Sequence, residues 1–131
     1  MTREQFTGLP DMAAEIKRRA AQVQRLRVRI TSPKGLDTRE KVQSSGGGNN
    51  MADVLIDMTA DLDALTIQYN GLRAEAEDII DAKLKEYPEL ILLTSLRYLS
   101  NNKWSDIAAV LGYSPATIYR MNDTAIDIMF N

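Results

Sequence analysis

The sequence has no cysteine and no histidine, and each absence excludes a class of chemistry. Without cysteine there is no disulfide framework and no thiolate metal site. Without histidine the chain lacks the commonest general base and the commonest metal ligand, and no carboxylate cluster or glycine-rich phosphate loop replaces them. We therefore expect no enzymatic activity, no metal or cofactor and no small-molecule substrate.

Long apolar runs are missing as well. No stretch approaches the roughly 18 apolar residues of a membrane span, and the N-terminus lacks the apolar region of a signal peptide. Hydrophobic residues make up 44% of the chain and charged residues 26%, a balance that suits a soluble helical protein. The expectation is a cytoplasmic protein that does not enter a membrane.

The net charge of −2 is unusual for a free-standing DNA-binding protein, but the charge is unevenly distributed. Residues 1–50 carry ten Lys and Arg against five Asp and Glu, whereas residues 51–83 carry two against eight. Residues 84–131 are nearly balanced, with four against five. The chain therefore divides into a basic, an acidic and a neutral part.

A basic amphipathic helix is predicted from Asp11 to about Ile30, after a lead-in over residues 1–10 that we expect to be frayed. Its apolar residues recur at steps of three and four: Leu9, Met12, Ile16, Val23, Leu26 and Ile30. The other face carries Lys17, Arg18, Arg19, Arg25, Arg27 and Arg29. We favour a solvated face bordering an acidic partner helix, with a nucleic-acid or membrane-surface stripe as the alternative.

Residues 31–50 (TSPKGLDTREKVQSSGGGNN) have the composition of a flexible connector. A second, longer helix is predicted from Met51 to about Lys85. Its heptad seam consists of Met51, Leu55, Met58, Leu62, Leu65, Tyr69, Leu72, Ala76 and Ile79. The seam continues in phase across Gly71, so we predict one unbroken helix in which the glycine costs about 1 kcal/mol.

The surface of this second helix is acidic outside the seam. The acidic residues are Asp53, Asp57, Asp61, Asp63, Glu75, Glu77, Asp78 and Asp81. Folding the basic helix back antiparallel on the acidic one would bury both seams and place opposite charges along the joint. The first half of the chain is therefore predicted to be a coiled-coil-like helical hairpin.

The stretch from Asn102 to Met121, NKWSDIAAVLGYSPATIYRM, has the pattern of a helix-turn-helix. Gly112 stands where the first helix must end in a left-handed backbone, which glycine adopts without a Cβ penalty. Ser114 and Pro115 then begin a helix to about Met129, with a serine cap and a proline that has no amide to leave unpaired. The expected buried positions are Ile107, Ala108, Leu111, Ile118 and Met121. A preceding helix is predicted from Glu89 to Leu99. Together with the two helices of the helix-turn-helix it would form a trihelical unit, which places its last helix in the DNA major groove.

The candidate DNA-binding residues are Lys103, Ser114, Ala116, Thr117, Tyr119 and Arg120. A recognition helix reads base edges with the exposed side chains of its first two turns. Arg120 suits guanine or a phosphate, Ala116 and Thr117 suit a thymine methyl group, and the other three suit phosphates. We predict that Trp104 is a core residue rather than a stacking platform for a base.

Few basic side chains accompany these candidates. The predicted helix-turn-helix unit contains three of them: Arg97, Lys103 and Arg120. The affinity of a protein for DNA increases with the number of phosphates that it neutralises. One copy is therefore expected to bind weakly. It needs a second copy in a homodimer, the basic N-terminal helix, or a larger assembly such as RNA polymerase that already holds the DNA.

The segment LRYLSNNKWSDIAAVLGYSPATIYRMNDTAIDIM resembles the region-4 helix-turn-helix of bacterial sigma factors. More narrowly, it resembles small phage and prophage transcriptional activators of the ArpU/RinA kind, and KVQSSGGGNNMAD upstream is similar to a connector in one such family. The resemblance covers most of residues 36–129 and implies activation of phage late genes through promoter DNA and RNA polymerase. Lys103 replaces the usual helix-capping threonine, so Asn102 is expected to cap instead.

These observations predict an all-α protein with two parts. Residues 1–85 form the antiparallel helical hairpin, including the connector at 31–50, and residues 86–131 form the sigma-region-4-like helix-turn-helix module. The leading hypothesis is a phage-type DNA-binding transcription regulator. The alternatives are a protein-interaction module or inhibitor of a host enzyme that uses the acidic hairpin, and a DNA-packaging recognition subunit.

Overall fold

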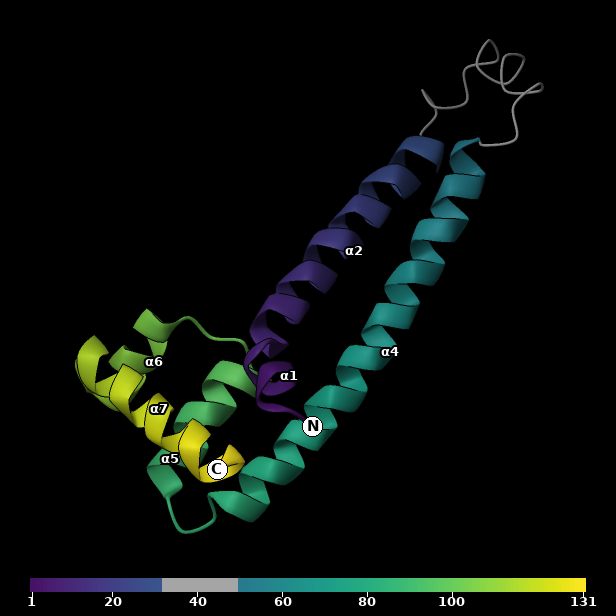
Figure 1. The fold of residues 1–131 in the computed structure, drawn as a ribbon. Coiled ribbons are helices and arrows are strands. Elements are labelled where there is room, and N and C mark those ends of the chain that lie inside the picture. Colours follow the sequence, from purple (N-terminus) through teal and green to yellow (C-terminus); the bar gives the residue numbers. More distant parts are fainter. Residues whose placement is uncertain (32–49) are drawn as a thin grey trace. The chain divides into compact units, whose positions relative to one another are not determined.

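The computed structural model describes residues 1–31 and 50–131, and this part of the chain contains helices and no strands (Figure 1). The helices are α1 (Arg3–Thr7), α2 (Leu9–Thr31), α4 (Met51–Lys83), α5 (Pro88–Thr94), the π-helical turn η2 (Ser95–Leu99), α6 (Trp104–Leu111) and α7 (Pro115–Phe130). The predicted all-α class is confirmed. The predicted connector lies outside the described residues except at its two ends. None of the described helices combines the length and the apolarity needed to cross a lipid bilayer.

The chain divides into two compact units, one of residues 1–13 with 68–131 and one of residues 14–67. The predicted division after residue 85 is not where the structure divides. The C-terminal part of α4 belongs with the later helices, because Arg73 Nε donates a hydrogen bond to the carbonyl of Leu99 at 3.0 Å. Asn101 Nδ2 likewise donates to the hydroxyl of Tyr69 at 3.1 Å.

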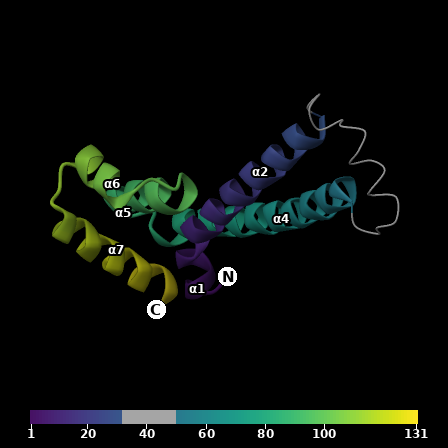
Figure 2. The ribbon, with the colours of Figure 1, turned by 90° about the horizontal axis from the view of Figure 1, so that it is seen from above.

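The first residues of the chain are an ordered helix, not the frayed lead-in that the sequence suggested. Thr2 and Gln5 form a capping box, in which each side chain accepts a hydrogen bond from the backbone amide of the other. Phe6 is completely buried, with its ring centroid 4.5 Å from that of Tyr98 and 5.4 Å from that of Phe130. Figure 2 shows α1 beside the C-terminal end of α7. These aromatic contacts tie the N-terminus to its unit.

Helix α4 runs from Met51 to Lys83 without a break at Gly71, as the continuous seam predicted. A Cβ built on Gly71 would meet nothing within 4 Å, so the glycine serves no close approach. The chain turns after Leu84, whose carbonyl accepts a hydrogen bond from the amide of Tyr87, and Pro88 begins α5. A proline at the first helical position leaves no amide unpaired.

The predicted helix from Glu89 to Leu99 is divided into α5 and the π-helical turn η2. The hydroxyl of Thr94 donates to the carbonyl of Leu90 at 2.7 Å, a bond that competes with the regular helical ladder. The amide of Ser100 then bonds to the carbonyl five residues earlier, that of Ser95, at 3.0 Å. The wider turn rotates the end of this helix relative to a regular one, which positions Arg97 and Tyr98.

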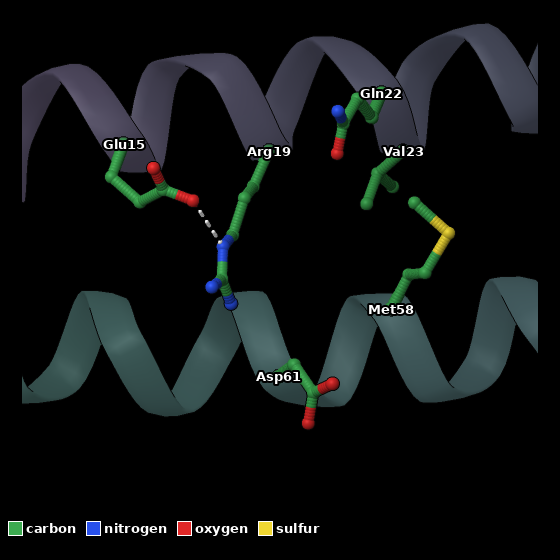
Figure 3. Close-up of a pocket in the computed structure, with 6 residues that line it drawn as sticks. All are labelled: Glu15, Arg19, Gln22, Val23, Met58 and Asp61. Carbon is green, nitrogen blue, oxygen red and sulfur yellow. Dashed lines mark hydrogen bonds and ion pairs between the residues drawn. The ribbon is translucent and has the colours of Figure 1, made fainter.

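In the unit of residues 14–67, α2 and the first part of α4 lie side by side (Figures 1 and 3). Val23 of α2 faces Met58 of α4 in Figure 3, as expected for two apolar seams that meet. Arg19 lies one turn earlier, and its guanidinium extends toward α4 while Nε donates to Glu15 at 2.7 Å. A shallow groove of about 380 Å³ is lined here by Glu15, Arg19, Gln22, Val23, Met58 and Asp61. The joint between these helices is therefore partly polar.

Candidate nucleic-acid interface

Helices α6 and α7 are joined by a tight turn that the sequence predicted residue by residue. Gly112 has φ 78° and ψ 24°, the left-handed conformation that closes α6. The amides of Gly112 and Tyr113 both donate to the carbonyl of Ala108, at 2.9 and 3.2 Å. Ser114 has an extended backbone, and its hydroxyl accepts a hydrogen bond from the amide of Thr117 at 3.3 Å. Both helix ends therefore have the predicted caps.

One side of this helix pair is held by an apolar cluster. Its buried members are Leu93, Ile107, Ala108 and Ile118, and Leu96, Trp104, Leu111 and Met121 pack against them. All five of the predicted buried positions belong to this cluster. Because α5 and η2 supply two of its members, the orientation of α7 depends on residues from three neighbouring segments.

The six predicted DNA-binding residues lie at the beginnings of α6 and α7. Lys103, Ser114, Ala116, Tyr119 and Arg120 are exposed, and Thr117 is half-buried. A chain of hydrogen bonds joins three of them, since Thr117 Oγ1 lies 3.0 Å from Ser114 Oγ and accepts from Arg120 Nη2 at 3.3 Å. Ala116 and Lys103 take no part in that chain. The first two turns of α7 thus present a hydroxyl pair and a guanidinium on one ridge.

Tyr119 is held differently, by an aromatic contact with α6. Its ring centroid is 5.6 Å from that of Trp104 in an edge-to-face arrangement, while half of the tyrosine stays exposed. Trp104 also contacts Tyr98, at 6.5 Å between centroids, and carries the Arg97 guanidinium 4.7 Å from its ring centroid. Trp104 is therefore a packing residue, as predicted, and not an open platform for a base.

Arg97 has a role within the protein beside the one that the sequence suggested. Its Nη1 donates to the carbonyl of Asn102 at 3.1 Å, and its half-buried side chain lies over Trp104. Sequence reasoning missed this supporting role, because the π-helical turn that directs the side chain has no clear signature in the sequence.

Asn102 does not cap α6, contrary to the expectation. Its Nδ2 donates backward to the carbonyl of Leu96 at 3.1 Å, and its own amide donates to the same oxygen at 2.9 Å. The residue before α6 is Lys103, whose side chain makes no capping hydrogen bond. Asn102 therefore closes the preceding helix, because the wide turn leaves the Leu96 carbonyl without a helical partner.

The charges on α7 are separated along its length. Arg120 lies in the N-terminal half, where the first turn carries no acidic residue and the helix dipole is positive. Asp123 and Asp127 lie in the C-terminal half, and Asp127 forms an ion pair with Arg3 at 3.3 Å. Tyr113 donates a short hydrogen bond of 2.6 Å to Glu89, which raises the pKa of that tyrosine. The N-terminal end of α7 therefore has the positive potential that favours an anion.

Comparison of the chain with family models, curated proteins and solved structures gives no match. Among the residues that the structure describes, no three acidic side chains are grouped as a metal site would need. What supports a function is therefore the geometry and the charge of α6 and α7.

Proposed function

We propose that the protein is a DNA-binding transcription regulator of phage type, in which α6 and α7 form a sigma-like helix-turn-helix. The observation that carries the proposal is the start of α7. One side of that helix contributes Ile118 to the core, while the other presents Ser114, Thr117 and Arg120 as a hydrogen-bonded ridge. A helix exposed in this way at its N-terminal turns has the form that enters a major groove.

The polar groups suit distinct parts of a DNA duplex. Arg120 has the planar fork that binds O6 and N7 of guanine, and Thr117 and Ala116 offer methyl groups to thymine. Ser114, Tyr119 and Lys103 are exposed and offer hydroxyl and ammonium groups, which suit phosphates. In this assignment Arg120 and Thr117 determine sequence preference, and Lys103 contributes affinity alone.

The number of cations argues for a second source of affinity. Helices α6 and α7 and the residue before them supply two basic side chains, Lys103 and Arg120. Each phosphate contact contributes a slope of about 0.9 to the dependence of log K on log salt, so one copy would bind weakly at physiological salt. The regulator would therefore act as a homodimer or on DNA already held by RNA polymerase, consistent with activation of late genes.

The test is a mobility shift on DNA from the protein's own genomic neighbourhood. Arg120→Ala and Thr117→Ala should abolish the specific complex. Lys103→Ala should weaken binding to all sequences and reduce the salt slope by about 0.9. Lys85→Ala removes an exposed cation outside α6 and α7 and is the matched control, with binding retained. Wild-type binding by Arg120→Ala and Thr117→Ala would reject α7 as the recognition helix.

A further inference from the structure

The unit of residues 14–67 leaves much of its apolar surface uncovered. Among its described residues, 14–31 and 50–67, Val23 is the only one whose side chain is buried. Five large apolar side chains of the same ranges are at least 40% exposed: Val28, Met51, Val54, Ile56 and Ile67. These side chains leave apolar surface that a partner could cover.

The exposed surface of α4 forms a stripe distinct from its seam. Ile56, Ala60, Asp63 and Ile67 follow one another at steps of four, three and four, so they share one face of the helix. Ile56 is 65% exposed and Ile67 is 73% exposed. The seam residues Leu55, Met58, Leu62 and Leu65 are half-buried on another face, toward α2. Helix α4 thus has two apolar sides, and α2 of the same chain covers one.

Helix α2 has an outward face that is complementary to this stripe. Ala14, Ala21 and Val28 recur every seven residues and are all exposed, which gives α2 a shallow surface where large side chains of a neighbour can fit. Lys17, Arg18 and Arg25 border these small residues at steps of three and four. The stripe of α4 is bordered instead by the exposed residues Asp53 and Asp57, and the exposed Asp63 lies within it. Size and charge therefore match between the two outward faces.

We propose that the outward stripe of α4 binds the outward face of α2 in a second copy of this chain. Pairing of like helices is disfavoured, because α4 on α4 would oppose acidic residues and α2 on α2 would oppose basic ones. Pairing of unlike helices buries Ile56 and Ile67 against small residues and brings opposite charges to the rim. This interface does not depend on DNA binding, and its test contains no DNA.

The first experiment measures the mass of the full-length protein by sedimentation equilibrium. The wild type should have twice the 14.7 kDa of a single chain. Ile56→Glu and Ile67→Glu should each return the mass to that of the monomer. Val110→Glu is the matched control, because Val110 is 66% exposed on α6, and its dimer should persist. A monomeric wild type, or dimers in both isoleucine variants, would overturn the proposal.

A second experiment separates a lost interface from a damaged hairpin. One variant carries Lys17→Glu with Arg25→Glu, and another carries Asp57→Lys with Asp63→Lys. Each variant should be monomeric alone, because the outward faces of its α2 and α4 then carry charge of the same sign. Its far-ultraviolet circular dichroism spectrum should match that of the wild type, which would show that the helices are intact. An equimolar mixture should recover the dimer mass, since the reversed α2 of one chain then faces the reversed α4 of the other. Failure of the mixture to associate would show that these two faces do not meet.

Discussion

Trp104 and Tyr119 meet edge to face, with ring centroids 5.6 Å apart and ring planes inclined by 69°. The contact joins the first residue of α6 to the second turn of α7, on the side that we assign to DNA. Arg97 covers the same indole at 4.7 Å, so three segments meet at one aromatic side chain. The exposed tyrosine is thereby held in place before any ligand arrives, which reduces the entropy lost on binding.

Trp104→Ala should destabilise the unit that contains α6 and α7 by about 2–4 kcal/mol, below the full cost of a completely buried tryptophan because this one is half-buried. Urea unfolding followed by circular dichroism measures the difference. Tyr119→Ala, which removes the exposed half of the same contact, should cost less than about 1.5 kcal/mol. Equal losses in the two variants would mean that Trp104 has no packing role beyond Tyr119.

Two glycines should respond to alanine in opposite directions. Gly112 has φ +78°, so Gly112→Ala should destabilise the protein by about 1–2 kcal/mol although a Cβ would clash with nothing. Gly71 lies inside α4 in open space, so Gly71→Ala should stabilise it by about 1 kcal/mol through helix propensity. Midpoints of urea unfolding report both changes. A stabilising Gly112→Ala would contradict the left-handed turn.

The sequence was sufficient for the helices and for the α6–α7 turn, because local rules determine them. Helical periodicity located α2 and α4 within two residues at each end, and the Gly112 and Ser114 caps were both predicted correctly. The same rules located the five predicted positions of the apolar cluster, whereas Ile126 and Tyr98 are also buried and were not predicted to be. Which residues contact DNA stays a prediction, because surface side chains at the start of a helix have no neighbours that identify their ligand.

The sequence was insufficient where the structure depends on contacts distant along the chain. Phe6 is buried by Tyr98 and Phe130, residues more than ninety positions away. The spacing of Thr2 and Gln5, which fits a capping box, is the local signal that could have predicted order there. The division between the two units was misplaced for the same reason. Hydrogen bonds from Arg73 and to Tyr69 attach the end of α4 to the later helices, and nothing in its heptads reveals them.

Phe6→Ala should destabilise the unit of residues 1–13 and 68–131 by about 3–5 kcal/mol, because a completely buried ring is removed from between two others. Phe6→Leu should recover much of that loss by filling the cavity. Thr2→Ala, which removes the helix cap alone, should cost about 1 kcal/mol. Thermal and urea unfolding of the full chain give the three values. A Phe6→Ala protein as stable as the wild type would show that α1 does not pack as described.

Alkaline pH should destabilise the protein through Tyr98. Burial raises the pKa of its hydroxyl, which donates a hydrogen bond to Asn122 Oδ1 at 2.8 Å, above the ordinary value of 10.0. Above pH 10 the unfolded chain therefore loses the tyrosine proton before the folded protein does. The stabilisation is complete below pH 10 and is lost as the pH rises through the pKa of the folded state.

Tyr98→Phe removes this dependence and also the hydrogen bond to Asn122. At pH 8 the variant should be less stable than the wild type by about 1 kcal/mol. The difference should shrink as the pH rises above 10, because only the wild type loses stability from this group. Urea midpoints at several pH values test the convergence. Tyr113→Phe should show a dependence of the same sign, because the hydrogen bond to Glu89 also raises the pKa of that hydroxyl. Parallel curves for Tyr98→Phe and the wild type would show that Tyr98 titrates as an exposed tyrosine does.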